Sequence, residues 1–198
     1  MPLSTHQGRV RYQNYLMSSL FAALTAAGAF LRIPLTFYVP ITLQTFFVIL
    51  AGSVLGAKFG AISQIIYLTV GLLGAPIFAH GGGPGYVFQP TFGYLVGYPI
   101  AAYAIGYMIW GKNDSNRSNL PGFLRICFSN LMGVLIIFVF GVTVLYLNIK
   151  MIVGKPITLG TALWGGFVIF IPGDIIKILL SSFITVKLYR ILQALKHF

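Results

Sequence analysis

The chain has 198 residues, of which 58% are hydrophobic and only 8% are charged. Because about a quarter of the residues are charged in an ordinary water-soluble domain, this composition indicates a membrane protein. Thirteen Lys and Arg residues oppose only two acids, Asp114 and Asp174, and give a net charge of +11. Two acids exclude most acid–base catalytic sites and metal sites built from carboxylates. The basic residues flank apolar runs and form no separate stripe with interleaved aromatics, so they do not indicate nucleic-acid binding.

Six apolar runs predict an all-α, polytopic membrane protein with six transmembrane helices. They cover residues 15–31, 42–57, 59–73, 91–110, 123–147 and 160–188, after a polar segment of residues 1–14. A span needs about 20 residues. The second and third runs are shorter and meet at residues 58–60, so we expect a tight helical hairpin there.

The last run is interrupted by Pro172 and Gly173. Proline is favoured in the first turn of a helix, where its missing N–H is not needed. We therefore expect the last span to begin near Pro172. The stretch of residues 160–171, which contains Trp164, then becomes a short re-entrant or interfacial piece.

The basic residues also predict the orientation of the helices. With the N-terminus inside, the inner side carries nine of them, Arg9, Arg11, Lys58, Lys112, Arg117, Arg125, Lys187, Arg190 and Lys196, and the outer side carries Arg32, Lys150 and Lys155. Because basic residues accumulate on the cytoplasmic side, we expect both termini and the polar linker 111–122, which contains Asp114, in the cytoplasm. The loops 32–41, 75–90 and 148–160 are expected on the outer face. We expect residues 1–198 to form one transmembrane domain in the plasma membrane.

Asp174 and Lys177 are the strongest candidates for a functional site. Ionisable groups within a membrane span are costly and usually face a bundle interior or a wet cavity. Three positions apart on a helix, the two can pair with each other, and an acid in the first turn favours the positive end of the helix dipole. A purely structural pair is therefore the alternative. A helix start with an ammonium one turn further on is also suited to hold a ligand carboxylate.

The outer loop 75–90 contains three successive glycines and is a candidate lid, with an ordinary flexible loop as the alternative. It is not a P-loop, because it lacks the Lys-Ser/Thr ending. His80 is expected to be a hydrogen-bonding loop residue rather than a metal ligand, since His6 and His197 are assigned to the opposite face.

Weaker signals lie in the first two helices. Gln44 and Thr45, at the outer end of the second helix, can bond a ligand or merely satisfy backbone carbonyls. Small residues four apart in the first helix form a stripe where another helix, from this bundle or a partner, can approach closely; they are Ala22, Ala23, Ala26 and Ala27. Aromatic residues such as Phe138 and Phe170 more often serve packing or face lipid than bind a ligand.

Six segments carry a further signal: QTFFVILAG at 44–52, LG at 55–56, YL at 67–68, GLLGAPIFA at 71–79, PTFGYLVGY at 90–98 and PGDIIK at 172–177. Together they resemble the BioY family, the biotin-capturing S subunits of energy-coupling factor (ECF) transporters. The resemblance implies a six-helix S-subunit fold that holds biotin between helix ends and the outer loop, near the outer face. It also implies a transmembrane coupling subunit, on which the alanine stripe docks, and two ATP-binding subunits.

The family's acid and lysine correspond to Asp174 and Lys177. The full set of predicted ligand contacts is Asp174, Lys177, Gln44, Thr45, Phe78, His80, Gly82, Tyr86, Gln89 and Tyr94. His80 and Phe92 depart from the family pattern, and no arginine occurs in 91–110, so the loop and the fourth helix differ from some relatives. We predict no cofactor and no metal, with biotin as the transported ligand and membrane lipid around the protein.

Biotin's chemistry suits such a pocket, because an apolar ring system with ureido groups and a carboxylate needs an acid, a lysine and a few amides or hydroxyls. An S subunit for another vitamin is the first alternative. A polytopic membrane enzyme would need paired acids or a nucleophile with a base, and no GxSxG or HExxH motif occurs. A passive channel is disfavoured because the charged pair lies near one end of its span.

Overall fold

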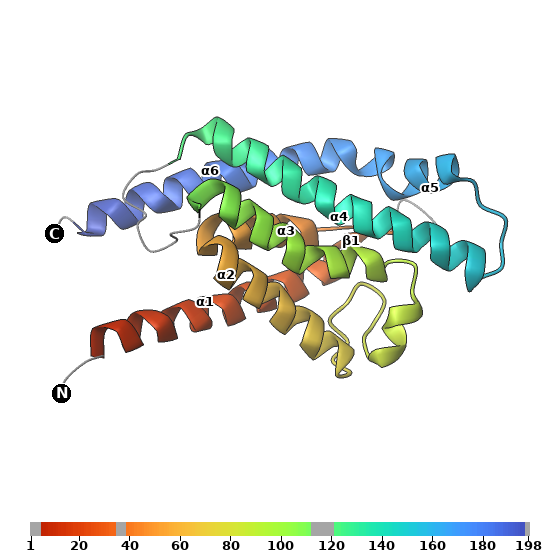
Figure 1. Ribbon diagram of the computed structural model, residues 1–198, viewed down its shortest axis with the longest axis horizontal. Helices are drawn as coiled ribbons and strands as arrows, with labels where there is room; N and C mark the ends of the chain where they lie inside the picture. Colours follow the sequence, from red (N-terminus) through yellow and green to blue (C-terminus); the bar gives the residue numbers. More distant parts are fainter. Residues whose placement is uncertain (1–4, 35–38, 112–120, 197–198) are drawn as a thin grey trace.

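The computed structural model describes residues 5–34, 39–111 and 121–196, which form a bundle of helices (Figure 1). The long helices are α1 (Thr5–Phe30), α2 (Gln44–Leu72), α3 (Phe92–Trp110), α4 (Phe123–Met151) and α6 (Ile171–Lys196). Shorter elements are α5 (Leu159–Gly166) and the 3-10 turns η1 (Pro84–Phe88) and η2 (Val168–Phe170). Two strands of two residues each, β1 (Arg32–Ile33) and β2 (Ile41–Thr42), pair antiparallel.

Among the described residues, four helical stretches are long and apolar enough to cross a membrane. They are Gln44–Leu72, Phe92–Trp110, Phe123–Met151 and Leu159–Ile191. This pattern agrees with an integral membrane protein. The last stretch contains α5, η2 and most of α6, which confirms that the apolar run divides and that its long helix starts beside Pro172.

A sharp break divides α2 into two arms at Gly56, where φ is 84° and ψ is −176°. Only glycine adopts this conformation readily. A side-chain carbon at Gly60 would lie 2.9 Å from the Cα of Gly52, so the second arm folds back on the first. The predicted pair of helices is present, but the expected turn at 58–60 is wrong. The charged Lys58 suggested the turn, whereas the backbone reverses two residues earlier, at Gly56.

Two further elements differ from the sequence expectation. The first helix begins at Thr5, well before the apolar run that starts at residue 15, because polar residues can continue a helix outside the apolar region. The β1–β2 pair was not predicted, because strands of two residues carry no readable alternation of polar and apolar positions.

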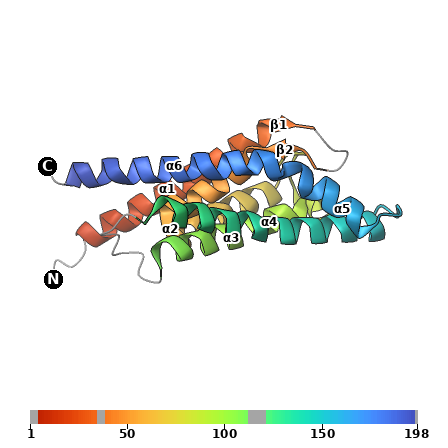
Figure 2. The same cartoon turned by 90° about the horizontal axis from the view of Figure 1, so that it is seen from above.

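The start of α1 and the end of α6 lie at one end of the bundle, and the outer loop, β1 and α5 lie at the other (Figures 1 and 2). The end with the termini also holds the break in α2 and the start of α4 (Figure 1). The count of basic residues predicted this grouping of segments at the two ends of the bundle. Asp114 and most of the 111–122 linker lie outside the described residues.

The bundle centres on α2, which packs against α1, α3 and α6, while α4 packs against α3, α5 and α6. A buried polar bridge joins three of these helices. Ser53 of α2 donates to the Asn130 side-chain oxygen of α4 at 2.7 Å, and the Asn130 amide donates to Ser182 of α6 at 3.0 Å. Because hydrogen bonds between helices stabilise packing within a membrane, this bridge fixes α6 against the centre of the bundle.

Candidate ligand pocket

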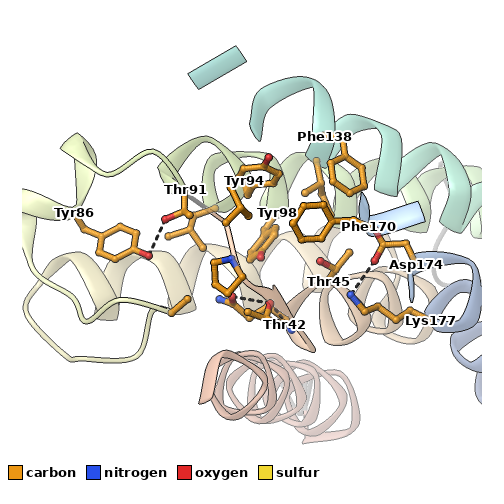
Figure 3. A pocket seen from close by; sticks show the side chains of 16 residues that line it. Thr42, Thr45, Tyr86, Thr91, Tyr94, Tyr98, Phe138, Phe170, Asp174 and Lys177 are labelled. Carbon is orange, nitrogen blue, oxygen red and sulfur yellow. Dashed lines mark hydrogen bonds and ion pairs between the residues drawn. The ribbon is translucent and has the colours of Figure 1, made fainter. Parts of the chain in front are cut away.

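A pocket lies at the end of the bundle opposite the termini, between the helix ends and the outer loop (Figure 3). The space between its side chains amounts to about 510 Å³, including the part that opens to solvent. Its lining residues are Val39, Pro40, Thr42, Gln44, Thr45, Ala79, Tyr86, Thr91, Tyr94, Leu95, Tyr98, Ile137, Phe138, Phe170, Asp174 and Lys177.

Asp174 and Lys177 form the charged side of the pocket (Figure 3). Lys177 Nζ lies 2.9 Å from Asp174 Oδ1, and the two residues are only 7% and 4% exposed. Their mutual attraction offsets part of the cost of burying both charges. The ion pair engages one carboxylate oxygen and one ammonium hydrogen. The other carboxylate oxygen and the remaining ammonium hydrogens can serve a ligand.

Uncharged polar groups lie on the other sides of the pocket. The Thr42 hydroxyl donates to the Gln44 side-chain oxygen at 3.0 Å, next to the start of α2. Tyr86, in the outer loop, exchanges a hydrogen bond of 3.0 Å with Thr91 at the start of α3 (Figure 3). Burial raises the pKa of Tyr86, so its hydroxyl stays protonated near neutral pH. These groups can orient a polar ligand in an otherwise apolar space.

Aromatic side chains form the wall between α3 and α4. The rings of Tyr94 and Phe138 meet edge to face with centroids 6.0 Å apart, and Phe138 also contacts Phe170 of η2 at 6.0 Å. The Tyr94 hydroxyl donates to the Gly166 carbonyl at 2.7 Å and so fixes α5 to α3. Such a wall suits a flat or apolar ring system.

Six of the ten predicted contact residues line this pocket: Asp174, Lys177, Gln44, Thr45, Tyr86 and Tyr94. The lining residues that sequence reasoning did not select include Tyr98, Phe138 and Phe170. Because 15% of the residues are aromatic, the sequence does not distinguish the aromatic residues of the pocket from those that only pack in the core. Thr42 stands in the same short motif as Gln44, and that proximity was the signal that could have found it.

The other four predicted residues belong to the outer loop but do not line the pocket. Phe78 is buried against Tyr67, with ring centroids 5.3 Å apart, and anchors the loop to α2. Gln89 is exposed and ends η1. A side-chain carbon at Gly82 would lie 2.0 Å from the Ala75 carbonyl oxygen, so this glycine permits a close turn within the loop.

His80 lies with Arg32 in a separate hollow at the protein surface. Partial burial and the neighbouring Arg32 lower the pKa of His80, so the imidazole is neutral near pH 7. Arg32 donates a hydrogen bond to the Ala79 carbonyl, which ties β1 to the outer loop. His80 thus lies beside the loop's attachment rather than in the pocket.

The alanine stripe of α1 divides between two faces. Ala22 is buried and Ala26 packs with it against the core, whereas Ala23 and Ala27 are exposed. The inner pair lets α2 approach closely. Only the outer pair is available to a partner protein.

The fold and the pocket define an integral membrane protein with a small-ligand pocket at one end of its helix bundle. No cluster of three or more His, Cys, Asp or Glu residues that could hold a metal ion occurs in the described part of the chain. The sequence model of the BioY family matches residues 4–194. The chain belongs to the BioY family.

Curated relatives and a solved structure agree with this assignment. The chain is 40% identical over 179 residues to a probable biotin transporter BioY of Lysinibacillus sphaericus, covering 90% of this chain and 88% of the relative. It is 34% identical over 177 residues to the biotin transporter BioY of Thermotoga maritima, covering 89% and 95%. It also superimposes on the S-component for biotin from an ECF-type ABC transporter with a TM-score of 0.79, at 26% identity and 95% coverage of both chains.

Proposed function

We propose that this chain binds biotin at the outer face of the plasma membrane and serves as the substrate-specificity subunit of an ATP-driven ECF-type importer. The observation that carries the proposal is the buried Asp174–Lys177 pair beside an aromatic wall in one pocket. Biotin combines ureido N–H groups and a carboxylate with an apolar bicyclic ring. The carboxylate of Asp174 can accept a ureido N–H, and Lys177 can face the ligand's carboxylate or carbonyl.

In this proposal six segments cross the membrane: α1, the two arms of α2, α3, α4 and α6. Both termini face the cytoplasm, because the bundle end with Lys58, Arg125, Lys187 and Arg190 is the more basic one. The pocket then faces outward, where it meets external biotin. Residues 1–198 form a single transmembrane domain.

Transport requires partners, which we propose to be a transmembrane coupling subunit and two ATP-binding subunits. The chain itself is proposed to be a binding subunit without enzymatic activity or cofactor, so ATP hydrolysis takes place in those partners. Binding of biotin under the outer loop favours the closed, loaded form that the partners then reorient.

Uptake of labelled biotin by cells that express the chain with its partner subunits tests this function. Biotin should accumulate, excess unlabelled biotin should suppress the signal, and thiamine and riboflavin should not. Uptake of another vitamin, with no biotin uptake, would support an S subunit of different specificity. Absence of any vitamin uptake or binding by a folded sample would favour a membrane enzyme instead.

We expect Ala27→Trp to reduce ATP-driven biotin uptake by about tenfold or more while leaving biotin affinity unchanged. The exposed alanines Ala23 and Ala27 form a flat face, and a large side chain there keeps a partner helix at a distance. Leu131→Trp, on the exposed side of α4, is the control and should leave uptake unchanged. Normal uptake by Ala27→Trp would place the docking face elsewhere.

A further inference from the structure

Tyr67 lies behind the pocket, in the second arm of α2, and is only 1% exposed. It is absent from the pocket lining. Its ring packs edge to face on Phe78 and lies 6.5 Å from the Tyr98 ring, centroid to centroid. Its hydroxyl lies between two other segments: it bonds to the side chain of Gln44 and to the backbone carbonyl of Ile77 in the outer loop.

The hydrogen bonds of Tyr67 have only one possible direction. The Ile77 carbonyl can only accept, so the Tyr67 hydroxyl donates its single hydrogen to it, at 3.1 Å. The Tyr67 oxygen must then accept from Gln44, so the side-chain NH2 of Gln44 faces Tyr67.

This direction also fixes the other end of the Gln44 amide. With its nitrogen toward Tyr67, its oxygen faces Thr42, whose hydroxyl donates to it at 3.0 Å. The Thr42 hydroxyl oxygen in turn lies 3.3 Å from the Gln44 backbone nitrogen and accepts a hydrogen bond from its N–H. A single chain of donors and acceptors thus runs from the start of α2 to the outer loop.

These hydrogen bonds determine which donors and acceptors Gln44 can offer to a ligand. A carboxamide has two N–H donors and about two acceptor positions on its oxygen. Tyr67 takes one donor and Thr42 takes one acceptor position. One N–H and one acceptor position remain on a side chain that lines the pocket. A donor beside an acceptor matches the N–H and C=O of a cyclic urea.

We propose that Tyr67 is a positioning residue that couples the outer loop to the donor and acceptor pattern of Gln44. While Ile77 accepts the Tyr67 hydrogen, the Gln44 amide is held in one orientation. When the loop moves away, the Tyr67 hydroxyl is free to donate to Gln44. Tyr67 can then form a hydrogen bond with the Gln44 amide in either orientation. This inference rests on the proposed function, because it takes the pocket as the biotin site.

A second attachment restrains the same part of the loop. Arg32 of β1 donates to the Ala79 carbonyl, two residues beyond the carbonyl that Tyr67 holds. Ala79 lines the pocket, as does Tyr86 further along the loop. Residues 77–79 are therefore held from two elements, and moving them changes the pocket wall and the Tyr67 bond together.

A double-mutant cycle on biotin affinity tests whether Tyr67 acts through Gln44. Tyr67→Phe keeps the ring and should weaken binding about tenfold, the effect of one lost hydrogen bond at the upper end of its usual range. In the Gln44→Ala background, Tyr67→Phe should cause no further loss. Tyr103→Phe, on the exposed side of α3, is the matched control and should bind as wild type. Independent, multiplying losses in the double variant would overturn the proposal.

Hydrogen exchange in the ligand-free protein tests the link to the loop without biotin. The Phe78 amide bonds to the Gly81 carbonyl at 2.8 Å, and the Gly83 amide bonds to the Gly71 carbonyl at 2.7 Å. Both amides should exchange several times faster in Tyr67→Phe than in wild type, because the loop loses one attachment. Unchanged exchange would overturn the inference whether or not wild type binds biotin, whereas failure of wild type to bind would overturn only the proposed function.

Thr42→Val provides a second variant if Tyr67→Phe does not fold. It removes the other partner of the Gln44 amide and leaves the loop attachment intact. It should weaken biotin binding more in the otherwise wild-type protein than in the Gln44→Ala background, where only Thr42's own place in the pocket wall is changed, and it should leave loop exchange unchanged. An equal loss of affinity in the two backgrounds would show that the amide is not the group being positioned and would overturn the proposal.

Discussion

Replacing Asp174 by Asn, or Lys177 by Met, is expected to weaken biotin binding by about 10- to 100-fold. Hydrogen bonds to charged groups contribute about 1.5–3 kcal/mol each, and tenfold in affinity corresponds to about 1.4 kcal/mol. Both substitutions nearly preserve side-chain volume, so the pocket keeps its shape. Equilibrium binding of labelled biotin to the purified variants measures the loss.

A double variant separates ligand binding from a purely structural role for the pair. Each single substitution leaves the other charge buried without its partner, which destabilises the fold. Asp174→Asn combined with Lys177→Met removes both charges, so stability should recover toward wild type while biotin binding stays lost. Recovery of both properties would identify the pair as structural. Lys187→Met, exposed on the same helix, is the control and should change neither.

The second large effect is expected at Gly106 of α3, where Gly106→Ala should lower the stability of the fold by about 2–3 kcal/mol. A side-chain carbon there would lie 2.1 Å from the Ala57 nitrogen and 2.2 Å from the Gly56 carbonyl carbon. These are backbone atoms at the break in α2, so relief requires that α3 and α2 separate.

Thermal unfolding of the detergent-purified protein measures this loss, which we expect to lower Tm by about 5–10 °C. Gly165→Ala is a matched control, because that glycine also lies in a helix but has open space where the new carbon would be. It should leave Tm nearly unchanged. Equal shifts for the two variants would show that the α3–α2 contact does not limit stability.

The sequence predicts the long apolar helices because a bilayer demands long apolar runs, and four of them are long and apolar enough to cross a membrane in the described part of the chain. It predicts the ends of helices poorly, because hydropathy reports membrane burial and not backbone conformation. The break in α2 shows the difference: the charged Lys58 suggested the turn, but the backbone reverses at Gly56, where positive φ is possible. The start of α1 at Thr5 has the same origin, since polar residues extend the helix beyond the apolar run.

The charged part of the pocket was predictable and the apolar part was not. Asp174 and Lys177 stand out because charge within a span is costly. Phe138 and Phe170 have no comparable feature in the sequence, since an aromatic side chain in a membrane helix can equally well face lipid. His80, Gln89 and Gly82 were selected because they belong to a glycine-rich loop, but they do not line the pocket. Which alanines of α1 face outward depends on how α1 packs against α2.

The most direct test of the account is a titration of the purified, monodisperse protein with labelled biotin. We predict saturable binding of one biotin per chain, displaced by unlabelled biotin but not by thiamine or riboflavin, and weakened in the Asp174→Asn variant. Absence of saturable biotin binding in a folded sample, or full binding by Asp174→Asn, would contradict the account.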